Sequence, residues 1–510
     1  MLSAIFGKKS DHPLADLKSV QVLLDDLPKN DPHRALAEIA DLVESLQDTR
    51  DFKLDHVFFV LRLLDEAAQP HLKRMVKDYF SPFEINKFQE NRLWLGMSNW
   101  SNLISAAYLR IFSEYCNGEK GSNSIKSHLP LLTARAIHAL MWQLKYICSR
   151  YGKVDNSYWL NLLRLYKHAE QNQYLDEPVN LYPGAVGNTT AKCEFGHLMV
   201  WHDTGLSTLS PLYIHLTERI VAQYCTTIAI QIHVSQNSRI CFDLNNPIEP
   251  TRVNAGATVS PSMRYVEMPD MKSRLEDLTK VLSKNIVPSD INLGGTYEAG
   301  VIKEAVQYLL NYIVAPPVRR NARRAADVTL GVVSGFDHVM QSAEALLGFD
   351  EVEKASWITE EISASGFGCK IPAKGNESIG IGSLLGMQPE GVPHWGVAVV
   401  RRLVRDESEQ LKVGAEILSN QVASVVLNQN RVAGGAIENG QPALWLYSKQ
   451  NDSTGETQML MRADTFTSGR SLQIQLSGKN YLLMPIGLEE KGLDYDLAKF
   501  RFAVQDAGST

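Results

Sequence analysis

Two pairs of adjacent arginines occur between Pro316 and Arg324, namely Arg319 with Arg320 and Arg323 with Arg324. A guanidinium group can hold a phosphate, or the O6 and N7 edge of a guanine base, through two parallel hydrogen bonds, and it can also stack on a base. The Pro-Pro pair ends the preceding helical pattern and sends the chain on in an extended conformation, so residues four apart point to the same side. The arginines therefore predict a site for a phosphate-bearing purine compound. Either Arg319 and Arg323 or Arg320 and Arg324 can provide the matching pair.

A second polar segment runs from Glu361 to Gly366 and precedes a series of short strands. A guanine base also presents N1–H and an exocyclic amine, for which the carboxylate of Glu361 and the hydroxyl of Ser363 are suitable acceptors. These two side chains share a face if the backbone is extended. We expect Gly366 to supply a tight turn with a positive φ and to leave space for the ligand.

Both segments match short elements of a known family. Arg319-Arg320-x-x-x-Arg324 resembles the RRxxxR element of the PilZ family, and Glu361-x-Ser363-x-x-Gly366 resembles its (D/N)xSxxG element. The strands that follow, through residues 413–418, are similar to the barrel that carries these elements. The resemblance covers roughly residues 315–420 and implies a bacterial receptor for cyclic di-GMP. In two respects the chain departs from the family pattern: Glu361 replaces Asp or Asn, and the stretch between the motifs is longer.

The resemblance implies an arginine segment that surrounds the ligand and a second element that holds a guanine. It implies a binding protein and not an enzyme, with no catalytic residue, no metal and no cofactor other than the cyclic di-GMP ligand. The expected ligand-binding residues are Arg319, Arg320, Arg323, Arg324, Glu361, Ser363 and Gly366.

Other interpretations of these residues stay open. The arginines can form a solvated basic linker, and the barrel can be a degenerate one within a ligand-free adaptor or scaffold protein. An enzyme hypothesis rests on His197, His202 and Asp203, which could ligate metals as in an HD-type phosphohydrolase. HD enzymes carry these ligands on helices, whereas Gly196 and the Thr204-Gly205 pair favour turns here, so a structural role is preferred.

Composition narrows the class of protein. The 510 residues include 44% hydrophobic and 21% charged residues, which is typical of a folded protein of several domains. The net charge of −6 gives no general attraction to nucleic acid, so nucleic acid is not an expected partner. No apolar run reaches the roughly 20 residues that span a bilayer, and the apolar stretch at residues 1–6 precedes Lys8 and Lys9, unlike a secretory signal. We expect a cytoplasmic protein without an integral membrane segment.

The six cysteines are scattered, without the spacing of a zinc site, and buried reduced thiols are expected.

The hydrophobic periodicity predicts a multidomain α+β protein. Residues 1–180 are expected to form an all-α domain, including long helices over 84–116 and 129–151 and a buried helix from Phe52 to Leu64. A mixed α/β module is expected over 181–314, where strands over 228–234 and 240–244 form a hairpin and a helix over 298–313 closes the module. The helical half is the expected site for an unidentified protein partner, and a homo-oligomer is possible.

After residue 314, apolar and polar residues mostly alternate, which is the period-two pattern of β-strands. A PilZ-like antiparallel β-barrel is expected over residues 315–420, with a short helix inserted over 336–347, and a β-rich extension over 421–510. The run from Gly380 to Gly386 does not have the spacing of a phosphate-binding loop and is interpreted as barrel backbone.

Overall fold

The computed structural model describes residues 12–49, 51–81, 85–185, 187–254, 260–314, 321–345, 353–429, 440–447, 455–476 and 479–505. The chain divides into two compact units: residues 1–206 with 211–317, and residues 318–510 with the short segment 207–210. The described residues contain no helix that is both long and apolar enough to cross a membrane.

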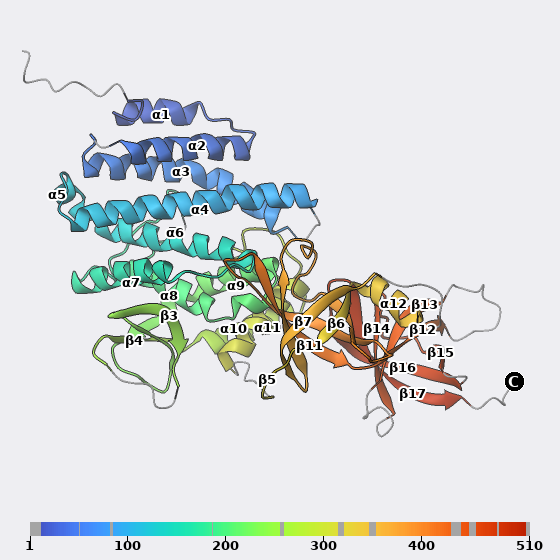
Figure 1. Ribbon diagram of the computed structural model, residues 1–510. Coiled ribbons are helices and arrows are strands. Elements are labelled where there is room, and N and C mark those ends of the chain that lie inside the picture. The colour runs from blue at the N-terminus through green and yellow to red at the C-terminus, as the bar shows by residue number, and fades with distance from the viewer. Residues whose placement is uncertain are drawn as a thin grey trace, which may run out of the picture. The chain divides into compact units, whose positions relative to one another are not determined.

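Helices form the first part of the first unit, and Figure 1 shows α1 to α4 and α6 stacked in successive layers. Polar caps begin several of them: the side chain of Asp31 accepts a hydrogen bond from the Arg34 amide at 3.0 Å, and Pro32 occupies the first turn of the same helix. The helices are α1 (Leu17–Asp25), α2 (Pro32–Asp48), α3 (Leu54–Tyr79), α4 (Lys87–Cys116), α5 (Ser122–Ile125), α6 (Leu129–Ser149), α7 (Asn156–Gln171), α8 (Ala191–His202) and α9 (Pro211–Tyr224).

The central helices bury most of their surface. Helix α6 contacts α4, α7, α8 and α9, and its buried residues lie on more than one face, including Leu132, Ile137 and Leu144. The helix predicted inside the bundle from its apolar sequence is the first half of α3, where Phe58, Leu61 and other apolar residues are fully buried. The all-α amino-terminal region is therefore confirmed.

A four-stranded antiparallel sheet and two further helices complete the first unit. The strands are β1 (Ala229–Gln231), β2 (Ser238–Asp243), β3 (Asn246–Arg252) and β4 (Met263–Glu267), and the helices are α10 (Met271–Leu282) and α11 (Ala299–Val314). The predicted hairpin between β1 and β2 is wrong, because the strand order is β1-β4-β2-β3 and β4 lies between them. Alternation identified both strands as half-buried, but a later segment supplies the strand that pairs with each of them.

The second unit begins with a closed antiparallel barrel. Six strands form the ring, which the pairing of β7 with β8 closes, and the short strand β5 (Arg324–Ala325) adds to the edge of β7. The ring strands are β6 (Thr329–Ser334), β7 (Ala355–Ser363), β8 (Gly366–Pro372), β9 (Leu384–Pro389), β10 (Gly396–Arg405) and β11 (Gln410–Ser419). The predicted inserted helix is α12 (Phe336–Ala345), which follows β6. Strand β9 begins only at Leu384, because Gly382 before it has a φ of +85° and ends the turn.

The predicted β-rich extension forms a second closed barrel of six antiparallel strands in the order β12-β13-β14-β17-β16-β15. These strands are β12 (Val422–Gln429), β13 (Gln441–Leu446), β14 (Glu456–Arg462), β15 (Leu472–Leu476), β16 (Lys479–Lys491) and β17 (Tyr495–Gln505). Strand β13 forms a hairpin with β14, and β15 forms another with β16.

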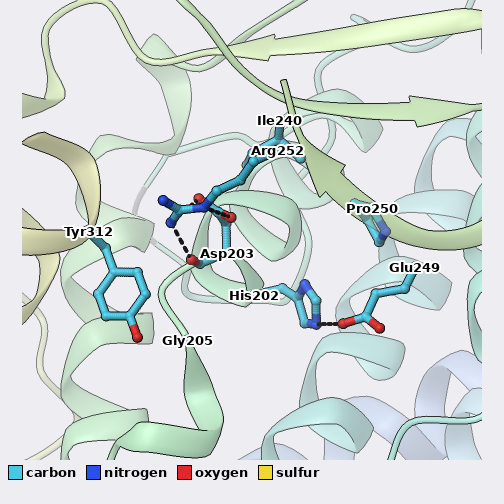
Figure 2. A pocket seen from close by; sticks show the side chains of 8 residues that line it. All are labelled: His202, Asp203, Gly205, Ile240, Glu249, Pro250, Arg252 and Tyr312. Atoms are coloured by element: carbon cyan, nitrogen blue, oxygen red, sulfur yellow. Dashed lines mark hydrogen bonds and ion pairs between the residues drawn. The ribbon is translucent and has the colours of Figure 1, made fainter. Parts of the chain in front are cut away.

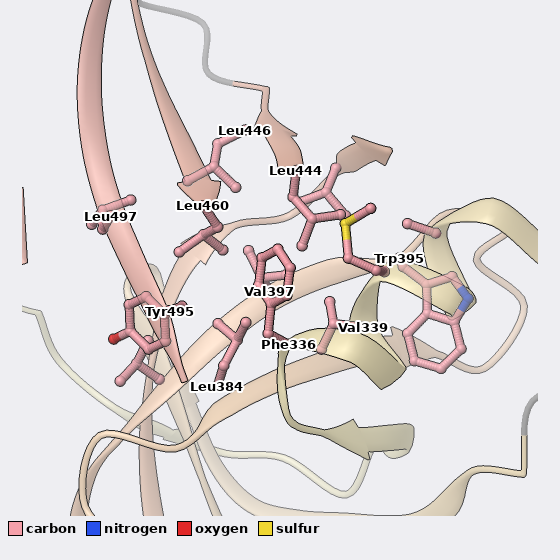
Figure 3. Packing of buried hydrophobic residues seen from close by; sticks show 14 of the residues in the cluster. Phe336, Val339, Leu384, Trp395, Val397, Leu444, Leu446, Leu460, Tyr495 and Leu497 are labelled. Atoms are coloured by element: carbon pink, nitrogen blue, oxygen red, sulfur yellow. The ribbon is translucent and has the colours of Figure 1, made fainter. Parts of the chain in front are cut away.

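The two barrels share a hydrophobic core (Figure 3). Phe336 and Val339 on α12 pack with Leu384 and Val397 of the first barrel, and with Leu444 and other residues of the second. Each of these side chains is at most 2% exposed. The predicted α+β fold class is thus confirmed, and the inserted helix has a packing role: its apolar face fills the seam between the barrels.

Candidate functional site

Strand β5 brings the two polar motifs together on the first barrel. Arg324 is paired with Ile362 and Ala325 with Glu361 in an antiparallel ladder. Residues that are far apart in the sequence therefore become neighbours across two hydrogen-bonded strands. Arg319 and Arg320, the other two predicted arginines, lie outside the described residues.

Two side-chain contacts connect the segments. The guanidinium of Arg323 forms an ion pair with the carboxylate of Glu361, and both side chains are about one-third exposed, at 31% and 37%. The side-chain amide of Asn321 donates a hydrogen bond to the Ser365 hydroxyl at 3.0 Å. Sequence reasoning missed Asn321 and Ser365, because both occupy positions at which the motifs accept any residue.

The strand register separates the two described arginines. Directly opposed residues share a face of a sheet, so Arg324 lies on the face of Ile362 and of its other partner, Phe367. Phe367 is buried, which marks this face as the barrel interior, although Arg324 itself is exposed at the end of the ladder. Arg323 and Glu361 belong to the opposite, outer face, where their side chains meet.

The second motif is a tight hairpin. Ser363, the last residue of β7, is paired with Gly366, the first residue of β8, so Ala364 and Ser365 form the turn. The Ser363 hydroxyl donates a hydrogen bond to the Gly366 carbonyl at 3.1 Å. Its oxygen lone pairs remain able to accept a hydrogen bond, as the predicted role requires. Glu361 and Ser363 are two residues apart on a regular section of strand, so they share a face as predicted.

The predicted positive φ of Gly366 is wrong. Gly366 is not among the residues with a positive φ and has the extended backbone of a strand residue. Its lack of a side chain matters for another reason: a Cβ atom there would lie 2.4 Å from the carbonyl oxygen of Ala415 on β11. The close approach between β8 and β11 requires a glycine at this position. A sequence motif within one segment does not show this requirement, because the contact is with another strand.

The residues of the enzyme hypothesis lie in the first unit and do not converge. His197 and His202 are on helix α8, so the turn predicted at Gly196 is wrong, whereas the turn predicted at Thr204 and Gly205 is present directly after the helix. The Nε2 atom of His197 lies 3.0 Å from the carbonyl oxygen of Glu218, whereas His202 and Asp203 line a cavity that His197 does not reach. Among the residues that the structure describes, no group of three or more His, Cys, Asp and Glu side chains could hold a metal ion.

His202 and Asp203 line a cavity of about 280 Å³ (Figure 2). Asp203 accepts two hydrogen bonds from Arg252 on β3, both at 2.8 Å, and His202 lies 3.3 Å from Glu249. The Arg252 guanidinium also lies 5.5 Å from the ring centroid of Tyr312. Burial raises the pKa of Asp203, an effect that Arg252 partly offsets. The polar groups of this cavity are therefore largely satisfied by one another.

Comparison with known proteins gives one match. The family model described as the N-terminal domain of the cyclic-di-GMP receptor FimW matches residues 18–236, from α1 to just beyond β1. The matched segment is less than half of the chain and precedes the Arg319–Arg324 and Glu361–Gly366 motifs, and the description of the family names the same ligand, cyclic di-GMP, that the sequence resemblance implies. Neither the curated proteins nor the solved structures include a match.

Proposed function

We propose that this chain is an effector that binds cyclic di-GMP on its first barrel, in the manner of a PilZ-type receptor. The observation that carries the proposal is the pairing of β5 with β7, which brings Arg323 against Glu361 and pairs Arg324 with Ile362, the residue between Glu361 and Ser363. The receptor named in the matching family supports the same ligand from an independent part of the chain.

The chemistry of the ligand matches these side chains. Arginine forks suit its phosphates and the O6 and N7 edge of a guanine, while Glu361 and Ser363 suit the donors on the other guanine edge. Asn321 adds an amide beside them, and Arg319 and Arg320 are proposed to complete the arginine segment.

The Arg323–Glu361 ion pair must open or rearrange before Glu361 can accept from a guanine. A partly exposed pair of this kind contributes about 0–1 kcal/mol because water screens it. One bidentate arginine–guanine contact contributes roughly 1–3 kcal/mol of discrimination. The free energy of one arginine–guanine contact therefore exceeds the free energy that is lost when the ion pair opens. The ion pair does not prevent the ligand from binding.

Isothermal titration of the full-length protein with cyclic di-GMP tests the proposal, with GTP as the specificity control. We expect saturable binding that the double substitution Arg323→Ala/Arg324→Ala weakens strongly. The matched control is Arg405→Ala on β10, because Arg405 pairs with Leu411 at the end of the barrel away from the Gly366–Glu416 pair. No heat at high micromolar ligand would contradict the proposal, and so would an equal loss in the control variant.

A second candidate is a ligand-free adaptor, which the engagement of Glu361 by Arg323 favours. The same titration separates the two, since an adaptor gives no heat with the intact protein. In either case we propose that the helical region of the first unit binds the protein partner. As a receptor for an intracellular messenger, the protein would act in the bacterial cytoplasm.

A further inference from the structure

Two neighbouring glycines leave part of the outer face of the first barrel without side chains. Gly368 on β8 is paired directly with Gly414 on β11, and directly opposed residues share a face of a sheet. Gly368 is also paired with Glu361 on β7, and Gly414 with Arg402 on β10. The four residues form one row across four strands, about 14 Å long, with a charged side chain at each end. We call the two glycines between them the glycine floor.

The Glu361 side chain covers one end of the floor. A Cβ atom built at Gly368 would lie 2.9 Å from the Cγ atom of Glu361 and 3.1 Å from its Oε1 atom. Arg323 holds the carboxylate there through their ion pair. Above Gly414 there is more space, because a Cβ atom there would meet Arg402 alone among the described residues, 3.3 Å from its Cβ atom. Opening of the ion pair therefore uncovers Gly368 and extends the floor from β11 to β8.

Two exposed cations border the floor at its other end. Arg402 and Lys412 are both exposed and, within the part of the chain that the structure describes, neither forms an ion pair. Lys412 lies two residues before Gly414 on the same face of β11. It is also directly opposite Lys370 on β8, and like charges in this arrangement repel each other. An anion beside Gly414 would relieve this repulsion.

The carboxylates around the floor already have partners. Glu416, two residues beyond the floor on β11, accepts a hydrogen bond from Arg401 at 2.8 Å. The Nζ atom of Lys370 lies 2.8 Å from the carboxylate of Asp406. The acidic side chains are therefore balanced by other cations, and the two exposed cations give this end of the floor a local excess of positive charge.

We propose that the ligand lies across the glycine floor and that Arg402 is a further ligand-contact residue, which holds a phosphate. The inference rests on the proposed binding of cyclic di-GMP to the first barrel. This ligand has two phosphates and two guanines, and the side chains on β5 and β7 all lie at one end of the row. The floor lets the ligand approach the backbone closely, and the Arg402 guanidinium, with Lys412 as a second positive charge, suits a phosphate at the other end.

Titration calorimetry of the full-length protein with cyclic di-GMP tests the role of Arg402. We expect Arg402→Gln to weaken binding about 10- to 100-fold, because it removes a hydrogen bond between charged groups. Arg402→Lys should keep most of the affinity, since an ammonium group still pairs with a phosphate. The matched control is Arg405→Gln on the same strand: Arg405 already has Glu409 as its partner, so the affinity should not change.

Two outcomes would count against Arg402. An affinity of Arg402→Gln equal to that of the intact protein overturns the proposal. A loss in Arg402→Lys as large as that in Arg402→Gln overturns the assignment to a phosphate, because only a contact that needs the planar fork of arginine would lose so much.

A second titration tests the floor itself. Gly414→Leu places a side chain over the floor and should weaken binding about tenfold or more. Gly414 is a strand residue without a positive φ, so leucine is compatible with its backbone. Gln410→Leu is the control, because it adds the same side chain to the same strand four residues away. Thermal unfolding checks that both variants are folded. Equal affinities of the two leucine variants would show that the ligand does not cross the floor.

These measurements separate the inference from the proposed function. The intact protein can bind and Arg323→Ala/Arg324→Ala can lose affinity while Arg402→Gln and Gly414→Leu bind as the intact protein does. In that case the proposed site stands and its extension over β11 and β10 is wrong. If the intact protein gives no heat with cyclic di-GMP, both are wrong.

Discussion

Arg323 and Arg324 are adjacent in the sequence but differ in their surroundings. Arg323 faces the Glu361 carboxylate on the outer face of the barrel, whereas Arg324 shares the face of Ile362. The family resemblance assigns the third motif arginine to Arg324, while spacing alone leaves either register open. Single substitutions can therefore decide which arginine contacts the ligand.

We predict that Arg324→Ala weakens cyclic di-GMP binding by about one to two decades, because one bidentate arginine–guanine contact is worth roughly 1–3 kcal/mol. Arg323→Ala is the matched comparison, since it removes an equal charge one residue away and also frees Glu361. Titration calorimetry of both variants gives the result. An unchanged affinity in Arg324→Ala with a loss in Arg323→Ala would show that the motif register is shifted by one residue.

Gly366→Ala should destabilise the second unit by about 1–3 kcal/mol, as overpacking of a close contact does. The new Cβ atom would meet the Ala415 carbonyl oxygen at 2.4 Å, and backbone cannot move aside as a flexible side chain can. Thermal unfolding followed by circular dichroism measures the change. Gly487→Ala is the control, because a Cβ atom there has no heavy atom within 4 Å; an equal shift in both variants would contradict the explanation.

At the scale of elements, a buried ion pair joins α6 to α9. The Nζ atom of Lys145 lies 2.7 Å from Glu218, and both side chains are at most 2% exposed. The Nε2 atom of His197 on α8 lies 3.3 Å from the same carboxylate. The nearby positive charges hold the pKa of Glu218 well below its usual value despite its burial. Three helices thus depend on one charged group.

Lys145→Met should destabilise the first unit by about 3–5 kcal/mol, because it leaves the Glu218 charge buried without its main partner. The double variant Lys145→Met/Glu218→Leu should recover much of the loss. Lys192→Met is the control: its partner Asp176 is 76% exposed, and an exposed pair is worth about 0–1 kcal/mol. Urea unfolding measures the free energy of unfolding of all three variants. A Lys145 variant as stable as the Lys192 variant would refute the role of the pair.

A second charged cluster links the two barrels. Arg401 on β10 donates to both carboxylate oxygens of Glu490 on β16, at 2.7 and 2.6 Å, and the Tyr495 hydroxyl donates to the same group at 2.6 Å. Burial raises the pKa of Glu490, but the hydrogen bonds and the charge of Arg401 lower this pKa by a larger amount, so the net shift is downward. The barrels are thus joined by this cluster as well as by the core around α12.

A carboxyl group with a depressed pKa in the folded state stabilises that state above its unfolded pKa, and the contribution disappears as pH falls through the folded value. We therefore expect Glu490→Gln to flatten the loss of thermal stability of the second unit below the ordinary glutamate pKa of 4.5. Glu407→Gln, on an exposed turn, is the control and should keep the wild-type profile. If the melting temperatures of the Glu490 variant and of the wild type fall by the same amount between pH 7 and pH 3, this role of Glu490 is ruled out.

At the scale of the whole molecule, the boundary between the two units falls at Pro317 and Val318, directly before the four arginines in the sequence. If ligand binding favours one arrangement of the units, it must do so through differential affinity for the two arrangements. We predict that small-angle scattering profiles of the full-length protein change with saturating cyclic di-GMP. The Arg323→Ala/Arg324→Ala variant should show no change. Identical wild-type profiles with and without ligand would contradict a ligand-dependent arrangement of the units and leave the binding proposal intact.

Much of the secondary structure was predictable because its signal is local. The long helical pattern over 84–116 became α4, and the strand pattern expected through residues 413–418 became part of β11. Burial of one face imposes a period of 3.6 or 2 on the residues of a single element, whatever that element packs against. The residue types of the proposed ligand site were identified in the same way, since each motif lies within one short segment.

The sequence by itself determined which segments form most of the helices and strands, the β-rich character of the second half, and the chemical character of the arginine and Glu361 segments. Only the tertiary structure decided which elements meet. It inserted β4 between β1 and β2, placed Arg323 against Glu361, required Gly366 for contact with Ala415, and closed the β-rich extension into a second barrel. These outcomes depend on contacts between residues distant along the chain, and no pattern confined to one segment specifies its partner.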